Sequence, residues 1–403
     1  MTEDAAYRTS TQYRLWSFTP ESLSSLRKTT NSLACARVKA AIKRAREARA
    51  AAESNGTSSI SSGEKGTSNG SRSVSGSATP QATDKDKDIE CLSVEEEQKL
   101  VGFYCVKAME LADFCGFPTN VKATALTYLH RFYLSNSPMT YHPKTLMPSI
   151  LFLATKTENH YTPLTSFASK LPKTTPEEVV APEFLVTQGL RFTFDVRHPL
   201  RALEGGLMEL LALAKGTYVS LPHDASTGPQ LKEAMERTLA GGVGNGTALQ
   251  GRIRSAYEAA KQTLKTSALL TDAYFLYTPS QIFLASLLLA DEALTRFYLD
   301  TKFASTESGK KTKIMTVLRS CTTLLSTSVT TTRPSTEELK ELKRIDKKLY
   351  ACRNPEKIDL VGLNAAVKRG GGDGADEERA AKKRKLEIES KKAGDLFGPA
   401  LVK

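Results

Sequence analysis

Apolar residues recur along most of this chain at the three- and four-residue spacing of amphipathic helices, and strand-like alternation is scarce. The most apolar part is 269–290, where two apolar runs flank the turn at 277–280. Thr278 can cap a helix and Pro279 fits its first turn, so one helix should end near Leu276 and another begin at Pro279. This second helix has almost no polar face, which predicts that it is central and buried.

The same pattern predicts a first group of five helices within residues 89–199. Ser93 and Glu96 form a capping box at its start, and Gly116-Phe117-Pro118 ends the first helix. Further helices are expected from about 119, from about 143 to 158, over 164–171, and from the capped start at 175–178 to about 192.

A second group of similar size is predicted within residues 200–330. Helices are expected over 200–214, from about 249 to 276, from 279 to 293, near 296, and over 311–326. Residues 215–248 are rich in Gly, Thr and Pro, which indicates a long flexible loop. Its glycine run at 241–246 is not followed by Gly-Lys-Ser/Thr and lacks GxGxxG spacing, so it predicts no nucleotide site.

Segments outside the two groups differ sharply in composition. Residues 1–53 contain a predicted helix from Pro20, and Trp16 and Phe18 should anchor it to the body; a mobile tail with stray aromatics is the alternative. Residues 54–88 are almost free of apolar side chains, which predicts a disordered insertion.

Ser335-Thr336-Glu337-Glu338 caps a last helix over 335–353, and 354–403 is predicted to be a disordered basic tail. One face of that last helix should carry Leu339, Leu342, Ile345 and Leu349.

Composition and motifs limit the classes of function that the chain can have. The 403 residues carry a net charge of +12, spread along the chain, which permits contact with nucleic acid without establishing it. The six cysteines form no CxxC pair and the histidines stand apart, so no metal site and no cofactor are predicted. No apolar run approaches the roughly 20 residues that span a bilayer. No catalytic motif is present, so an enzyme is not predicted.

The tail contains a basic cluster at Lys382, Lys383, Arg384 and Lys385. Such clusters are typical of nuclear localisation signals or of contacts with polyanions, although most charge runs are simply solvated. We interpret this cluster as a nuclear localisation signal.

Three blocks resemble the cyclin H family, the regulatory subunits of the CDK-activating kinase. They are YRLWSFTPESLSSLR at 13–27, YLHRFYLSNSPMTYHPKTLMPSILFLATKTE at 128–158, and TDAYFLYTPSQIFLASLL at 271–288. The resemblance implies an all-α fold with two tandem five-helix cyclin boxes, 89–199 and 200–330, flanked by N- and C-terminal helices. Residues 54–88 are an insertion relative to this pattern.

The resemblance also implies a partner-binding pair. Without the resemblance, Lys156 would be interpreted as a basic residue in the last turn of a helix, where its positive charge complements the negative end of the helix dipole. Cyclins place a Lys at this point of their third helix and a Glu early in the fifth, and both contact the kinase; the matching residues are Lys156 and Glu183. Pro148, inside the third helix, and Pro182 depart from the family pattern.

The implied function is that of a non-catalytic, nuclear regulatory cyclin. Its partners would be the cyclin-dependent kinase catalytic subunit, a RING-finger assembly factor and, through them, the TFIIH core. The complex would phosphorylate the RNA polymerase II C-terminal domain and CDK activation loops. Neither membrane nor direct nucleic-acid binding is expected.

Two alternatives remain open. One is another transcriptional cyclin, close to cyclins C, K or T. The other is a TFIIB-like nucleic-acid-binding factor, although those proteins typically carry a zinc ribbon and no CxxC pair exists here. The first predicted helix lacks the MRAIL-type substrate-docking motif of cell-cycle cyclins. His130 also stands at a position of the second helix that is Asp in many of those cyclins. Both features favour the transcription-linked, cyclin H-like branch of the family.

Overall fold

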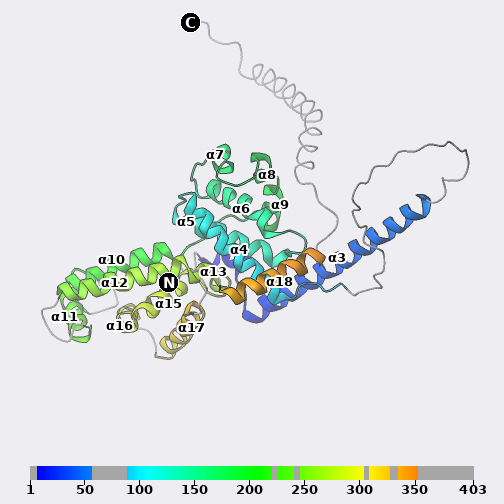
Figure 1. Cartoon of the computed structure of the whole chain (residues 1–403). Coiled ribbons are helices and arrows are strands. Elements are labelled where there is room, and N and C mark those ends of the chain that lie inside the picture. The colour runs from blue at the N-terminus through cyan, green and yellow to red at the C-terminus, as the bar shows by residue number, and fades with distance from the viewer. Residues whose placement is uncertain are drawn as a thin grey trace, which may run out of the picture.

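The computed structural model describes residues 7–56, 89–219, 226–239, 246–303, 308–326 and 335–352. Every regular element in these ranges is a helix, which confirms the all-α expectation. Two helical bodies lie side by side, and the long helix α3 runs along the first and projects beyond it (Figure 1). None of the described helices is long and apolar enough to cross a membrane.

The first body is built around α5 (Thr119–Ser135), which is buried along most of its length. It packs between α4 (Val94–Phe114) and α6 (Pro143–Thr157). The predicted capping box of Ser93 and Glu96 begins α4, with both reciprocal hydrogen bonds present. Three short helices close the body: α7 (Leu164–Ala168), α8 (Pro176–Val180) and α9 (Glu183–Gly189).

The second body is built around α15 (Pro279–Ala290), the helix predicted to be central. Thr278 and Gln281 form its capping box, and Pro279 occupies its first turn. Gly206 lets α10 approach α15 closely, because a Cβ there would lie 2.5 Å from Cζ of Phe283. Around α15 lie α10 (Leu200–Lys215), α12 (Gly246–Lys265), α16 (Glu292–Lys302) and α17 (Ser308–Ser326).

Two predictions for this body were wrong. The supposed loop 215–248 contains helix α11 (Gly228–Leu239), and α12 already begins at Gly246. Leu231, Met235 and Leu239 follow one another at four-residue spacing and are buried, so packing of an apolar stripe outweighed the Gly-rich flanks.

The helix predicted from about 249 to 276 is also interrupted. It divides into α12, α13 (Ser267–Leu270) and α14 (Ala273–Leu276). Thr266, between α12 and α13, leaves the helical region with φ −122° and ψ −87°. Asp272, between α13 and α14, forms an ion pair with Arg27 of the N-terminal helix. A tertiary contact of this kind cannot be inferred from local propensity.

The terminal helices both pack on the first body. Trp16, at the end of α2 (Thr11–Trp16), is only 1% exposed, and its Nε1–H donates to Oγ1 of Thr193 at 2.9 Å. Its role as an anchor is therefore confirmed. Helix α3 (Pro20–Gly56) follows, so residues 54–56, predicted to be disordered, are helical. The rest of the predicted insertion, 57–88, lies outside the described residues, as does the tail 354–403.

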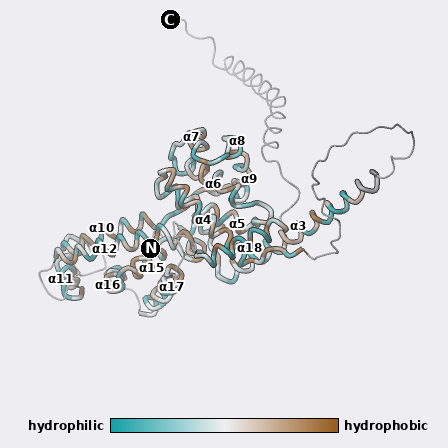
Figure 2. The backbone as a smooth tube through the Cα atoms, viewed as in Figure 1, coloured by the Kyte–Doolittle hydropathy of each residue, from teal (hydrophilic) through white to brown (hydrophobic). Residues whose placement is uncertain are grey.

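Helix α18 (Thr336–Cys352) packs beside α3 and α4 through Ile345, Leu349 and Cys352. Leu339, which the pattern placed on the same face, is 41% exposed. The buried side chains of the helix lie in its later turns, where Arg344 and Lys348 also reach Glu96 at 2.6 and 2.8 Å. Figure 2 shows how hydrophilic and hydrophobic positions are distributed along the helices of both bodies.

Candidate functional site

Lys156 and Glu183, far apart in the sequence, meet at the surface where α6 and α9 pack together. Lys156 lies in the last turn of α6, and its Nζ sits 4.8 Å from the ring centroid of the buried Phe152. Glu183 is the first residue of α9, directly after Pro182. Pro182 therefore begins the helix and fixes where this carboxylate emerges.

The two charges form a direct ion pair. The Lys156 Nζ donates to Oε1 and Oε2 of Glu183 at 2.8 and 2.7 Å. The side chains remain 45% and 25% exposed, so polar atoms of a second protein can reach both. Phe184, next to Glu183, is 61% exposed, which adds an apolar ring beside the pair. Aromatic side chains, Phe among them, are enriched at protein–protein interfaces relative to the rest of the surface.

Pro148 does not end or restart α6. The helix runs without interruption from Pro143 to Thr157 with Pro148 inside it. Proline cannot donate the backbone hydrogen bond to the residue four positions earlier, which costs about 3 kcal/mol in an ordinary helix. The apolar side chains that α6 buries on both sides of Pro148, among them Leu146, Ile150 and Leu153, offset this cost.

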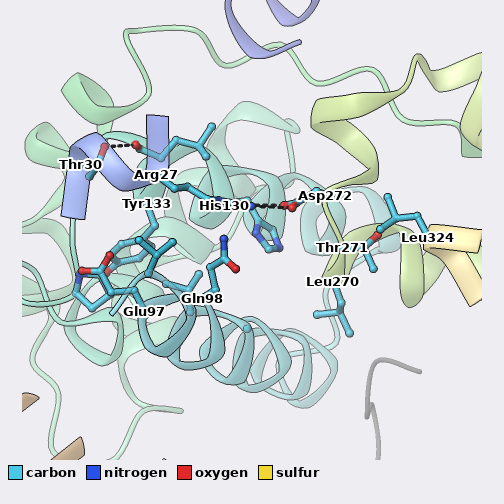
Figure 3. A pocket seen from close by; sticks show the side chains of 15 residues that line it. Arg27, Thr30, Glu97, Gln98, His130, Tyr133, Leu270, Thr271, Asp272 and Leu324 are labelled. Atoms are coloured by element: carbon cyan, nitrogen blue, oxygen red, sulfur yellow. Dashed lines mark hydrogen bonds and ion pairs between the residues drawn. The ribbon is translucent and has the colours of Figure 1, made fainter. Parts of the chain in front are cut away.

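The N-terminal helix and both bodies meet at a pocket of about 300 Å³ (Figure 3). Arg27 of α3 donates to both carboxylate oxygens of Asp272, at 2.8 and 2.6 Å. Burial by itself raises the pKa of Asp272, but the hydrogen bonds and charge of Arg27 outweigh it and lower that pKa. His130 of α5 lies 3.0 Å from the Leu269 carbonyl, and burial lowers its pKa. These contacts fix the second body relative to the first.

A second polar link joins the two bodies through His198. Its Nε2 lies 2.8 Å from Oγ1 of Thr124 in α5, and its Nδ1 lies 3.0 Å from the hydroxyl of Tyr274 in α14. Burial lowers the pKa of His198 to about 4, so the ring is neutral at physiological pH. Its hydrogen bonds are therefore structural ones between uncharged groups.

The described residues contain no group of three or more His, Cys, Asp or Glu that could hold a metal ion. The buried thiols of Cys105 and Cys321 have pKa values raised to about 12 by burial, opposite to the shift that activates a nucleophilic cysteine. The basic cluster Lys382, Lys383, Arg384 and Lys385 lies outside the described residues.

The resemblance to the cyclin H family pointed to Lys156 and Glu183, which the structure places in direct contact, but the inter-body contacts could not be predicted from the sequence. Arg27 and Asp272 are 245 positions apart, and His198 and Tyr274 are 76 apart. No local motif links such residues. The only available signal was that Asp272 and Tyr274 both fall in the 271–288 block.

Two tandem helical bodies, each built around one buried helix, form the architecture of a cyclin fold. In agreement, a sequence model of the cyclin C-terminal domain matches residues 198–326. Cyclin mcs2 of Schizosaccharomyces pombe is 31% identical over 264 residues, which are 66% of this chain and 69% of the relative. A probable cyclin-H of Echinococcus multilocularis is 30% identical, over 70% of this chain and 71% of the relative. The chain belongs to the cyclin H family.

Further similarities extend over more of the chain. Cyclin CCL1 of Saccharomyces cerevisiae is 32% identical over 311 residues, 77% of this chain but only 64% of the relative's length. A chain in the structure of the CAK complex from Chaetomium thermophilum bound to ATP-gamma-S is 31% identical with a TM-score of 0.68, covering 92% of this chain and 96% of that one. A chain of the yeast TFIIK (Kin28/Ccl1/Tfb3) complex is 28% identical with a TM-score of 0.51, covering 79% and 100%.

Proposed function

We propose that this protein is the regulatory cyclin of a CDK-activating kinase, and that it binds the kinase through the surface around Lys156 and Glu183. The observation that carries the proposal is this exposed ion pair between α6 and α9, in a chain of the cyclin H family. Similar chains belong to the CAK complex and to the complex of Kin28, Ccl1 and Tfb3, which supports a kinase and a RING-finger assembly factor as partners.

The mechanism is allosteric, and the cyclin supplies no catalytic side chain. The Lys156 ammonium and the Glu183 carboxylate can donate to and accept from backbone groups of the kinase while they stay paired with each other. Phe184 adds apolar contact at the edge of the pair. This surface would hold the regulatory helix of the kinase inward and support the internal Lys–Glu pair that positions the ATP phosphates. Tighter binding to that active state shifts the kinase population toward it.

In this role the protein works in the nucleus as part of TFIIH. The activated kinase phosphorylates the RNA polymerase II C-terminal domain and the activation loops of other cyclin-dependent kinases. The basic cluster Lys382, Lys383, Arg384 and Lys385 would direct nuclear import. Replacing these four residues by alanine in a fluorescently tagged full chain tests the import claim, and unchanged nuclear accumulation would disprove it.

The test of the main proposal is co-expression with a CDK-activating-kinase catalytic subunit, purification, and a kinase assay on a polymerase C-terminal-domain peptide. We expect a stable complex with much higher activity than the kinase alone. A kinase that neither co-purifies with the chain nor gains activity would overturn the proposal. If the complex forms as expected, adding the RING-finger factor should stabilise it further.

A further inference from the structure

The short segment before α4 is the place where both terminal helices are tied to the first body. Asn31 of α3 donates to the backbone carbonyl of Leu92 at 2.9 Å. Lys348 of α18 reaches the carboxylate of Glu90 at 2.6 Å. Side chains of α3, α4 and α18 share one apolar cluster here, and Figure 1 shows these helices side by side.

Three free cysteines gather at this cluster. Cys35 of α3 and Cys91 of the segment before α4 are half-buried against it, and Cys352 of α18 is buried within it. Cys35 stands one helical turn after Asn31, whose side chain holds the residue next to Cys91. This contact brings Cys35 and Cys91 together, and their thiols are hydrogen-bonded to each other.

The surroundings of the two thiols give them different chemical roles. Burial, together with the hydrogen bond to Cys91 and the charge of Cys91, raises the pKa of the Cys35 thiol to about 12. Cys35 therefore keeps its proton and donates a hydrogen bond, and Cys91 is the thiolate that an oxidant meets first. Cys91 also lies outside any helix, so it can make the small movement that a covalent bond requires.

We propose that Cys35 and Cys91 form an intramolecular disulfide when the protein meets hydrogen peroxide. The Cys91 thiolate attacks one peroxide oxygen, which gives its sulfenic acid and a hydroxide that a solvent proton converts to water. The Cys35 sulfur then attacks the Cys91 sulfur, and the departing hydroxyl takes the Cys35 proton as a second water. The two sulfurs lose two electrons, which the peroxide gains. Thiol reductants reverse the bond, so it is transient in a reducing compartment.

Cys352 is the competing partner for Cys91, and its surroundings disfavour it. Its side chain is 0% exposed, and burial raises the pKa of its thiol. The Leu92 backbone N–H donates to its sulfur, which holds it in place. A bond to Cys352 would pull this sulfur out of the packed end of α18.

The disulfide is additional to kinase binding and lies on other elements than α6 and α9. It joins positions on the two sides of residues 57–88 and fixes α3 covalently to the start of α4. A cross-link of this kind stabilises a protein chiefly because it restricts the unfolded chain. The packing of the N-terminal helix would therefore become harder to lose under oxidising conditions.

The test exposes the full chain to graded hydrogen peroxide, blocks free thiols with N-ethylmaleimide, and maps tryptic peptides by mass spectrometry without reduction. We expect peptide 29–37 linked to peptide 88–99 in the monomer, with two of the six thiols lost. The melting temperature should rise by about 5 °C. Dithiothreitol should remove both effects.

Two variants separate this pair from general thiol oxidation. Cys35→Ser should abolish both the linked peptide and the rise in melting temperature. Cys115→Ser removes another half-buried thiol, which lies near Lys170, and should keep both effects. Circular dichroism of the untreated variants should show unchanged helicity.

Three outcomes in the wild-type chain would overturn the proposal, whatever the variants do. One is peptide 88–99 linked instead to peptide 349–353, which contains Cys352. Another is a linkage found only in disulfide-joined dimers. The third is that both thiols stay free at a peroxide dose that oxidises Met208, which is 72% exposed and serves as an internal gauge of the dose.

Discussion

Reversing the charges at Lys156 and Glu183 separates two roles that this ion pair can play. Within the chain the pair is partly exposed, so its contribution to folding is about 0.2–1 kcal/mol. Both residues also lie at favourable helix ends, Lys156 in the last turn of α6 and Glu183 in the first turn of α9, which adds about 0.3–1 kcal/mol each. Lys156→Glu or Glu183→Lys should therefore lower the free energy of unfolding by only about 1–2 kcal/mol.

The effect on kinase binding should be larger. A reversed charge in a desolvated interface leaves partner groups unpaired or repelled, which costs about 2–5 kcal/mol. This corresponds to a Kd about 30-fold to about 4000-fold weaker. Affinity for the kinase subunit would be measured by surface plasmon resonance, and stability by guanidinium unfolding. Arg237→Glu is a matched control, because Arg237 forms an exposed 2.7 Å pair with Glu233 on α11.

The double variant Lys156→Glu/Glu183→Lys decides between the roles. It restores opposite charges at the same two positions, so the stability contributed by the pair itself should return, while both helix-end contributions stay reversed. The polarity presented to the kinase is inverted. We expect kinase binding to stay weak. Recovery of wild-type affinity would show that the pair is only an internal brace, and single variants that bind like the wild type would refute the assigned interface.

Three further predictions follow from packing, burial and composition. Gly206→Ala should lower the free energy of unfolding by about 1–3 kcal/mol, because its Cβ would lie 2.5 Å from the ring of the buried Phe283. Gly205→Ala, whose Cβ would meet nothing within 4 Å, should not lower the stability of the protein. Equal effects of the two in denaturant titrations would contradict this packing. His198 takes up a proton near pH 6.5 in the unfolded chain but only near pH 4 in the folded chain. The free energy of unfolding, measured by denaturant titration, should therefore fall as the pH is lowered from 6.5 to 4. The variant His198→Gln should lessen that fall. Deleting residues 57–88 should leave kinase activation essentially unchanged in the peptide assay, and a large loss would identify this segment as a working element.

Local chemistry fixed most helix starts in advance. Ser93, Thr175 and Thr278 each begin a helix with a complete capping box. All three starts were predicted, the one at Thr278 from its cap and the proline that follows it, and the contribution of Gln281 appears only in the structure. Helix α11 was missed because its apolar stripe is short and its flanks are Gly-rich. The resemblance, rather than any spacing rule, pointed to Lys156 and Glu183, which lie 27 positions apart.

The sequence by itself therefore determined the helical class, the two groups of helices and the central helix of the second group, because periodicity and caps act over a few residues. Tertiary structure alone decided how the parts are joined and what is left exposed. The Arg27–Asp272 pair and the His198 link are long-range contacts that form only once both bodies have folded. Helix α3 stays exposed beyond Ile42 because it outruns the surface that buries its earlier turns, and the length of that surface is set by helices elsewhere in the chain.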